Sequence, residues 1–492
     1  MNKQDLQNKL EPFIYDKLEK EEYEIVGKNP VELLTWNRLD LSFRLFYIDN
    51  KNKCNEMAIK VYYQVIKSQT LGTFKEVGNE HKFDIYEFIK SFNMTYNDIK
   101  NNGFDKSKTI IPLSSNGTIV NGAHRLSSAI HLNENIYCIK TNAPTMIADY
   151  KYFYDRNVSE EILDVVTTKF VEYAKNTYIA FLWPSGKGSK KLAESKFSNI
   201  VYKKKISLSS NGGYNLLFEL YKHMDWIGNE KNNYKGIQQK LIECFTSFES
   251  FTVLVFQSNS IEKVREIKEE VRKIYNIGYS SIHITDTKEE AIRISRLIFN
   301  ENGLHFLNYG NPFKIKSFVQ QLEVFANFIK KNNINRSDIV LDSSIVLSLY
   351  GLRKASDVDY LLDDDTLIIK PNRYIEPHDE VLKHYKKTKN ELIYNPNSYF
   401  YYKGFKFISF NELFIMKKNR NEGKDKNDCK IMESLIENNS LKKIVNQFKQ
   451  LVFYFKIKFK NNIVKLTIAI LKFTRTYNVI RSMYRNMKKR DL

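Results

Sequence analysis

Residues 110–132 read IIPLSSNGTIVNGAHRLSSAIHL, and this stretch decides the fold of the first part of the chain. Apolar residues at 110–113 precede a Ser-Asn-Gly turn, and a second apolar segment at 118–120 follows, which predicts a hairpin that leads into a helix. Gly122 lets the main chain approach an anion closely, and the amides at the helix start point toward it. The planar fork of Arg125 offers two hydrogen bonds to phosphate oxygens. We therefore expect a phosphate-binding loop formed by Asn121, Gly122, His124 and Arg125.

The five residues Asn-Gly-Ala-His-Arg at 121–125 resemble the (D/N)GxHR loop of the ParB/sulfiredoxin superfamily. The resemblance implies a small β-rich domain whose loop binds nucleotide phosphates, here with Asn121 in place of the commoner Asp. A simpler interpretation is that His124 and Arg125 only cap a helix, and the sequence leaves both open.

Length and composition predict a multidomain α+β protein. The 492 residues exceed the size of one core, and 42% apolar residues are ample for two to four domains. Four scattered cysteines without CxxC spacing indicate neither a disulfide framework nor a zinc site. A polar N-terminus and the lack of about 18 consecutive apolar residues predict a cytoplasmic protein that does not span the membrane. We expect boundaries near 1–149, 150–310, 311–438 and 439–492.

The net charge of +20 is concentrated at one end of the chain. Residues 441–492 contain fourteen Lys or Arg and one Asp, so this segment carries +13 of the total. Apolar and aromatic residues recur in it at nearly helical spacing. This pattern predicts a basic amphipathic helix on an anionic membrane surface. Packing against the rest of the protein and binding along nucleic acid are the alternatives.

Residues 150–308 alternate apolar strands with amphipathic helices, which favours an α/β layer. Its most suggestive polar residues are predicted to share a cleft, and they are Lys240, Arg272, His283, Asp286 and Glu290. The alternative is structural: Thr287 and Glu290 fit a capping box, while His283 packs and the two cations are solvated.

Asp357 and Asp359 form the second constellation. Side chains two apart on a strand point the same way, so these carboxylates can hold Mg²⁺ against a nucleotide triphosphate. Upstream, Ser343 and Ser344 follow an apolar strand and precede an apolar helix, so that hydroxyls and helix-start amides would face the phosphates. A Ser-capped helix beside exposed Asp residues, without turnover, is the simpler interpretation.

Residues 339–361 resemble the strand, Ser-Ser turn, helix and DhD signature of nucleotidyltransferases of the DNA polymerase β superfamily. The later stretch LFIMKKNRNEGKDKNDCKIM resembles the Lys, Arg, Lys-Asp and Asp pattern of small antitoxin-type and abortive-infection members, with matching residues at Lys417, Arg420, Lys424, Asp425 and Asp428. The resemblance implies catalytic Asp357, Asp359, Lys424 and Asp425, with Mg²⁺ and ATP or another nucleoside triphosphate. Asp342 stands where the family usually has Gly, and no third carboxylate is located.

The combined architecture resembles cytoplasmic enzymes of bacterial surface-polysaccharide loci. That resemblance implies phosphoryl or nucleotidyl transfer to a small-molecule or glycan acceptor, at the inner face of the plasma membrane. The alternatives are a ParB-like DNA-associated protein and a toxin or defence nucleotidyltransferase. Nucleic acid is the less favoured partner, because the charge lies in an apolar tail and no helix-turn-helix follows residue 125.

Overall fold

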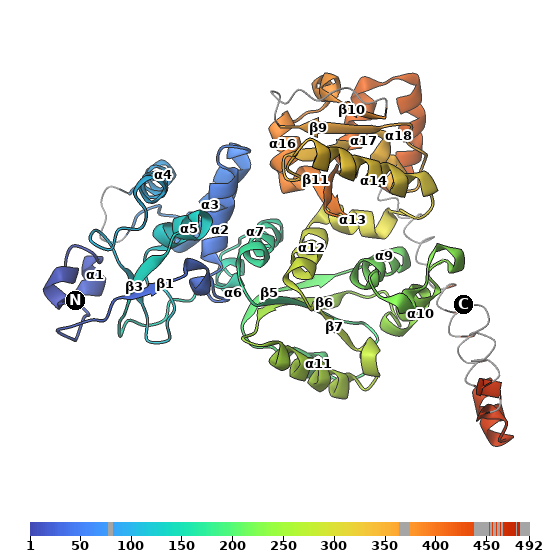
Figure 1. Cartoon of the computed structure of the whole chain (residues 1–492), viewed down its shortest axis with the longest axis horizontal. Coiled ribbons are helices and arrows are strands. Elements are labelled where there is room, and N and C mark those ends of the chain that lie inside the picture. Colours follow the sequence, from blue (N-terminus) through green and yellow to red (C-terminus); the bar gives the residue numbers. More distant parts are fainter. Residues whose placement is uncertain are drawn as a thin grey trace.

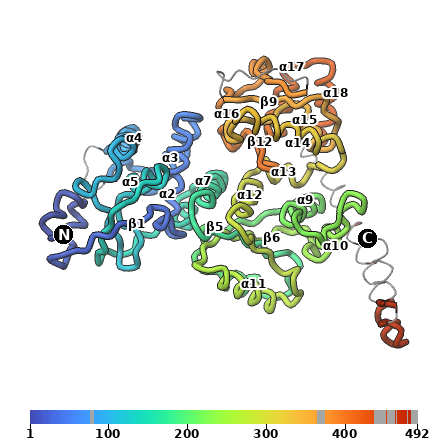
Figure 2. The backbone as a smooth tube through the Cα atoms, viewed as in Figure 1, coloured from blue at the N-terminus to red at the C-terminus, as the bar shows by residue number. Residues whose placement is uncertain are grey.

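The computed structural model describes residues 1–76, 82–363 and 374–436, and also 452, 455, 459, 463, 466–478 and 480–482. The chain is a mixed α+β protein with three separate β-sheets, one in each of the first three predicted segments (Figure 1). We call these the first, middle and third parts. The chain passes through them in order, from blue through green to orange (Figure 2).

The first part has a three-stranded sheet of order β1-β3-β2, with β1 antiparallel and β2 parallel to β3. The predicted hairpin is confirmed: Leu113 and Ile119 form an antiparallel bridge, and the Ser114 amide donates to the Thr118 carbonyl at 2.8 Å. The elements are η1 (Lys3–Leu6), α1 (Pro12–Tyr15), β1 (Val26–Lys28), η2 (Pro30–Leu33), α2 (Asp40–Asn50), α3 (Asn55–Gln69), α4 (Ile85–Asn102), β2 (Ile111–Leu113), α5 (Ala123–Leu132) and β3 (Ile136–Lys140).

The middle part contains every strand and helix predicted for it, but its sheet is antiparallel throughout, with order β5-β6-β4-β7. The sequence predicted an α/β layer from this alternation without assigning the directions of the strands, and the structure shows them to be antiparallel. The β4–β5 and β6–β7 crossovers each skip one strand position, which an antiparallel strand fills, and this is the split βαβ arrangement. The strands are β4 (Thr177–Leu182), β5 (Ile200–Ile206), β6 (Phe251–Gln257) and β7 (Ile282–Ile284).

Helices of the middle part begin at polar caps. The side chains of Ser209, Ser260 and Thr287 each accept a hydrogen bond from an amide of the first turn, which satisfies a donor that the helix cannot pair itself. The helices are α6 (Tyr150–Tyr154), α7 (Glu160–Tyr173), α8 (Lys190–Glu194), α9 (Ser210–Tyr221), η3 (Asp225–Ile227), η4 (Glu230–Asn232), α10 (Lys235–Cys244), α11 (Ile261–Tyr275), η5 (Gly278–Ser280), α12 (Lys288–Ile298) and α13 (Glu301–Tyr309).

The third part is built on a mixed five-stranded sheet of order β10-β9-β8-β12-β11. Central β8 pairs antiparallel with β9 and parallel with β12. The elements are α14 (Lys316–Lys331), β8 (Ile339–Asp342), α15 (Ser344–Leu349), β9 (Val358–Leu362), β10 (Ile375–Pro377), η6 (Asp379–His384), α16 (Lys389–Tyr394), η7 (Pro396–Ser398), β11 (Tyr399–Tyr402), β12 (Phe405–Ile408), α17 (Phe410–Arg420) and α18 (Gly423–Ile436). A strand expected at 366–370 lies outside the described residues.

The three parts share one large cluster of buried apolar side chains. Phe43 of α2 packs against Phe153 of α6 with ring centroids 4.6 Å apart, and Phe306 of α13 stacks on Phe400 of β11 at 5.2 Å. The first contact joins the first and middle parts, and the second joins the middle and third parts. Apolar packing therefore continues across both boundaries.

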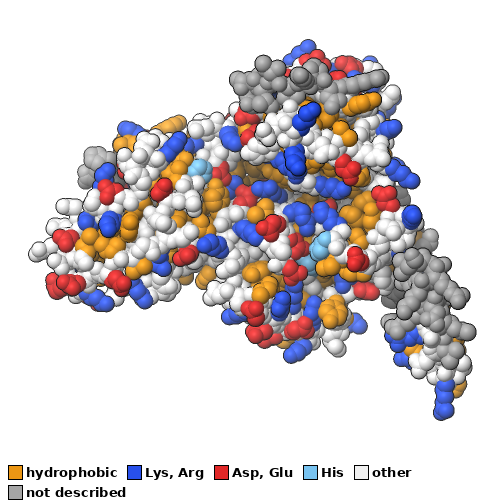
Figure 3. All heavy atoms as spheres, viewed as in Figure 1, with side chains coloured by type: hydrophobic (Ala, Val, Ile, Leu, Met, Phe, Trp, Pro, Cys, Tyr) orange, Lys and Arg blue, Asp and Glu red, His pale blue; other side chains and the backbone are white. Residues whose placement is uncertain are grey.

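The described residues of the C-terminal segment form helical turns that extend away from the three parts (Figure 1 and Figure 3). Their large apolar side chains are exposed, including Phe455, Phe459, Leu466 and Phe473. The expected amphipathic helix thus leaves these side chains without cover from the body. Within the described part of the chain, no helix is both long enough and apolar enough to cross a membrane.

Candidate functional site

The predicted Ser and Asp residues of the third part meet at one edge of its sheet. Asp342, the last residue of β8, lies in register with Asp359 of β9. Ser343 and Ser344 follow β8 directly, and the Ser344 hydroxyl donates to Asp357 at 3.3 Å. Asp357 and Asp359 are both half-buried while Val358 between them is buried, so the two carboxylates lie on the same face of the strand.

The turn between β8 and α15 has an unusual backbone. Ser343 has φ 60° and ψ −129°, a conformation that costs a non-glycine residue about 1–3 kcal/mol. Asp342 compensates, because its carboxylate accepts the Ser343 amide at 2.6 Å. This carboxylate is fully buried and also bonds Nδ1 of His378 at 3.0 Å and the hydroxyl of Tyr385 at 2.5 Å. Asp342 therefore fixes the turn.

The charges at this edge favour a cation. Burial raises the pKa of Asp359 to about 6, and the charges of Asp357 and Asp342 add to this, although His378 opposes it. The pKa of His378 is itself raised, because its hydrogen bond and ion pair with Asp342 outweigh the effect of burial. Asp342 is thus neutralised by His378, whereas Asp357 and Asp359 leave negative charge facing the same space.

A divalent cation would bind here through two protein carboxylates. Among the described residues, no group of three or more His, Cys, Asp or Glu has the geometry of a metal site. Mg²⁺ is commonly held by one or two carboxylates, with substrate phosphates and water completing its octahedron. The donors at Asp357 and Asp359 fit that mode of binding.

The late-helix residues form a buried ion-pair network. Lys417 contacts Asp425 at 3.2 Å and Asp428 at 2.9 Å, and all three side chains are almost fully buried. Arg420 forms a fork with Asp425, with both bonds at 2.8 Å, and Arg353 forms one with Asp428 at 2.6 and 2.9 Å. Arg420 and Lys417 lower the pKa of Asp425 to about 2, against the effect of burial.

Two further predicted catalytic residues, Lys424 and Asp425, lie at this network. Asp425 accepts from both Lys417 and Arg420, an arrangement that anchors α18 to α17. Lys424 is 65% exposed and contacts only the exposed Glu422, at 3.5 Å, among the described residues. Neither side chain contacts Asp357 or Asp359.

The loop at 121–125 is tightly held. Gly122 has φ 94°, and a Cβ atom there would lie 2.7 Å from Cδ1 of Ile111. Arg125 donates to Thr109 and, at 3.2 Å, to Asn121. His124 stacks on Phe92 at 4.4 Å and contacts the Tyr62 hydroxyl at 2.7 Å. Burial, together with the nearby charges of Arg44, Lys82 and Arg125, holds the pKa of His124 well below its usual value. His124 is therefore neutral near pH 7.

This loop combines features of both interpretations. His124 is packed as a structural residue, and Arg125 has partners within the protein. The first amides of α5 have no carbonyl acceptor within the helix, so they remain available to an anion. A phosphate bound there would compete with Thr109 and Asn121 for the Arg125 guanidinium.

The predicted polar residues of the middle part do share a cavity. It measures about 570 Å³, and its lining includes Lys240, Arg272, His283, Asp286 and Glu290. Thr287 also caps α12, accepting the Glu290 amide at 3.1 Å, as the structural alternative expects. Trp226 and Tyr279 add exposed aromatic rings to the cavity, and Arg272 lies over the Tyr279 ring at 4.5 Å.

Three hydrogen-bonded side chains lie along one wall of this cavity. The Tyr221 hydroxyl lies 3.1 Å from Nδ1 of His283, whose Nε2 lies 3.2 Å from Glu290. Burial would raise the pKa of Glu290, but His283 and the Asp286 amide lower it below its usual value. Ionised Glu290 can only accept, so Nε2 of His283 carries a proton and donates it to Glu290. The sequence pattern did not indicate Tyr221, since nothing near it marks a site.

Sequence reasoning also missed His378 and Tyr385. They follow Asp342 by 36 and 43 residues, and no spacing rule links them to it. In the sequence, Asp342 stands out only as a departure from the pattern that residues 339–361 otherwise resemble.

The chain was also compared with models of protein families, with curated proteins and with solved structures, and none of them matches it.

We expect Gly122→Ala to destabilise the first part more than Gly117→Ala does. Both glycines have positive φ, but a Cβ at Gly117 meets nothing within 4 Å. Gly117→Ala should cost about 1–2 kcal/mol for the backbone alone. Gly122→Ala should cost about 1–3 kcal/mol more, because Ile111 must move. Urea denaturation measures both, and equal losses would contradict close packing at the loop.

We expect Lys417→Ala to lower the free energy of unfolding by about 3–5 kcal/mol, because it leaves two buried carboxylates short of a cation. The matched control Lys424→Ala should cost at most about 1 kcal/mol, since its ion pair is exposed. Thermal and urea denaturation of the full chain test this. Comparable losses in the two variants would show that the network does not stabilise the third part.

Proposed function

We propose that this protein is a Mg²⁺-dependent nucleotidyltransferase whose site lies at the β8–β9 edge. The observation that carries the proposal is the convergence of Asp357 and Asp359 beside the strained Ser343-Ser344 turn. A turn that presents amides and hydroxyls, next to two carboxylates on a rigid strand, supports the binding of a triphosphate with its cation.

Each residue has a role in this proposal. Asp357 and Asp359 hold the cation, which stabilises the charge that develops on the phosphates. The amides and hydroxyls of Ser343 and Ser344 bind phosphate oxygens. Asp342 is a positioning residue: it does not reach the substrate, and it holds the turn in its strained form through the Ser343 amide. Lys424, which precedes Asp425 and is exposed, would contact a phosphate or the acceptor.

We further propose that the acceptor is a small molecule or glycan of a surface-polysaccharide pathway, and that the loop at 121–125 binds nucleotide phosphates. The first amides of α5 and the guanidinium of Arg125 support an anion site there. A ParB-like DNA-associated protein and a toxin or defence nucleotidyltransferase remain the alternatives. Identification of the labelled product after incubation with radiolabelled nucleotides would separate these classes.

We expect Asp357→Asn combined with Asp359→Asn to reduce Mg²⁺-dependent pyrophosphate release roughly 100-fold or more, because the charge stabilisation by the cation is lost. The matched control is Asp98→Asn, an exposed carboxylate on α4. Circular dichroism should show an unchanged fold. Full activity in the double variant would remove both carboxylates from the mechanism.

Binding of Mn²⁺, followed by electron paramagnetic resonance, provides a readout independent of turnover. Binding should weaken as the pH falls through about 6, because protonation of Asp359 removes a ligand. The double variant should not bind Mn²⁺ at this site at any pH. Binding that is the same in the double variant as in wild type would place the cation elsewhere.

We also propose that the C-terminal segment binds an anionic membrane surface. Its described apolar side chains are exposed, which supports an external partner over packing on the body. Aromatic rings would enter the headgroup boundary, and each Lys or Arg near the surface adds about 1 kcal/mol of attraction.

We expect the full chain to float with liposomes that contain phosphatidylserine, and flotation should fall with salt. Phe455→Asp with Phe473→Asp should abolish it, because both rings are exposed in the free protein and their replacement costs no core packing. Phe83→Asp, at an exposed Phe of the first part, is the control. If wild type does not float but binds single-stranded nucleic acid, and the double variant loses that binding, the nucleic-acid alternative is favoured.

A further inference from the structure

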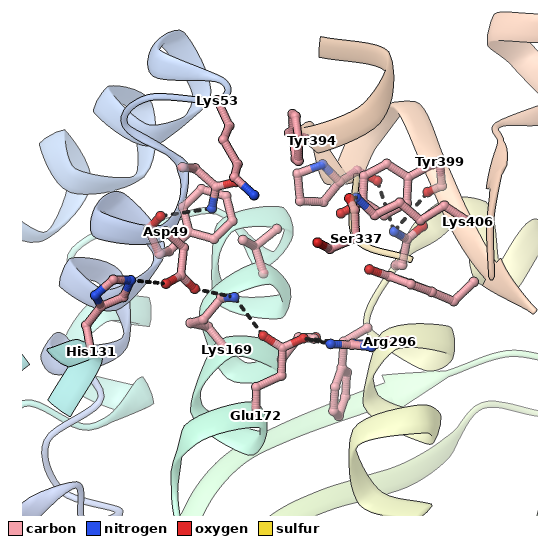
Figure 4. Close-up of a pocket in the computed structure, with 18 residues that line it drawn as sticks. Asp49, Lys53, His131, Lys169, Glu172, Arg296, Ser337, Tyr394, Tyr399 and Lys406 are labelled. Atoms are coloured by element: carbon pink, nitrogen blue, oxygen red, sulfur yellow. Dashed lines mark hydrogen bonds and ion pairs between the residues drawn. The ribbon is translucent and has the colours of Figure 1, made fainter. Parts of the chain in front are cut away.

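A second cavity lies where the three parts meet. It has a volume of about 370 Å³, within the range of small-molecule sites, which often lie between domains. None of the residues singled out from the sequence lines it. Figure 4 shows polar and charged side chains converging from α2 and the loop after it, from α5, α7 and α12, and from the third part. They include Asp49, Lys53, Lys169, Glu172, Arg296 and Lys406.

One wall of this junction cavity is electrically balanced. Lys169 lies between Asp49 and Glu172, at 2.7 and 2.6 Å, and Glu172 also pairs with Arg296 at 2.7 Å. Lys169 and Arg296 lower the pKa of Glu172 to about 2, although burial opposes this. The cations of α7 and α12 are therefore matched by carboxylates already present.

Lys406, on the opposite wall, is not matched in this way. It is 3% exposed, and its Nζ atom donates to the main-chain carbonyls of Ser337 and Ile393, both at 2.6 Å. Among the described residues it forms no ion pair, and burial lowers its pKa to about 7. Transferring an ammonium group from water into a protein interior is costly unless an anion accompanies it.

The surroundings of Lys406 are suited to a polar ligand. The rings of Tyr394 and Tyr399 lie 4.9 and 4.6 Å from its Nζ atom. The Nζ atom of Lys53 also lies over the Tyr394 ring, 4.8 Å from its centroid, but Lys53 is already paired with Asp338 at 3.0 Å. Across the cavity, the Thr168 hydroxyl of α7 is buried and finds no hydrogen-bond partner among the described residues. Lys406 is thus the unmatched charge, and Thr168 the unmatched hydroxyl.

We propose that the junction cavity binds a small phosphate monoester of sugar-phosphate size. Its phosphoryl group pairs with Lys406, and its hydroxyl-bearing part lies against the tyrosine rings and Thr168. Ser337 and Asp338 immediately precede β8, whereas Ser343 follows it, so this ligand lies at the other end of the same strand from the proposed nucleotide site. The two sites are therefore separate, and the proposal does not depend on nucleotidyl transfer.

Isothermal titration of the full chain with ribose 5-phosphate tests this proposal. Wild type should show saturable binding, and Lys406→Met should weaken it at least tenfold. The control Lys418→Met, at an exposed lysine of the same part, should bind like wild type. Thr168→Leu keeps every charge but fills the cavity, and it should also weaken binding at least tenfold. This second variant keeps the test valid if Lys406→Met fails to fold.

Further titrations distinguish the classes of ligand, and they distinguish this cavity from the β8–β9 edge. Ribose and gluconate should bind at least tenfold more weakly than ribose 5-phosphate, and inorganic phosphate should bind more weakly as well. The Asp357→Asn and Asp359→Asn double variant should bind ribose 5-phosphate normally, which distinguishes this cavity from the β8–β9 edge. No binding by wild type, or unchanged affinity in both Lys406→Met and Thr168→Leu, would overturn the proposal. Equal affinity for gluconate or inorganic phosphate would overturn its assignment to a monoester.

Discussion

Neutralisation of buried charge governs the arrangement of this protein. Asp40 of α2 lies between Arg38 and Arg44 in the first part, Lys169 lies between Asp49 and Glu172 at the junction, and Lys417 lies between two carboxylates in the third. Removing one member of such a group leaves an uncompensated charge in a medium of low polarity. The helices that carry these side chains are therefore fixed relative to one another. Arg38 also donates to the Ile119 carbonyl at 2.6 Å, so the same constraint positions the strand before the loop at 121–125.

Local sequence pattern predicted most elements of the fold, because it records periodicity and capping. The strand at 177–182 and the helix at 288–298 follow directly from apolar spacing and from the Thr287 cap. The direction of strand pairing in the middle part could not be predicted in this way, since a split crossover and an adjacent one alternate strands and helices identically. Short β10 carries only three residues, and its pairing with β9 depends on tertiary contacts that no local window contains.

The candidate site was predictable to a similar extent. The pair Asp357 and Asp359 was apparent because their spacing of two matches the period of a strand. His378 was not, because it reaches Asp342 across 36 residues of chain. The late-helix pattern shows the limit of motif reasoning: Asp425 fits a catalytic pattern by position, yet two buried cations occupy its oxygens. The polar residues of the middle cavity were grouped correctly, whereas Tyr221 became visible only through its bond to His283.

The pairing of β1 with β3 has a consequence for how the chain is made. Val26 is in register with Cys138, and Lys53 reaches Asp338 across 285 residues. A ribosome that adds about 5–20 residues per second needs several seconds to supply the partner of the first strand, and longer still to supply Asp338. During that interval the N-terminal segment is held without its sheet partner. The first sheet can close well before synthesis ends, but the junction closes only after the third part has emerged.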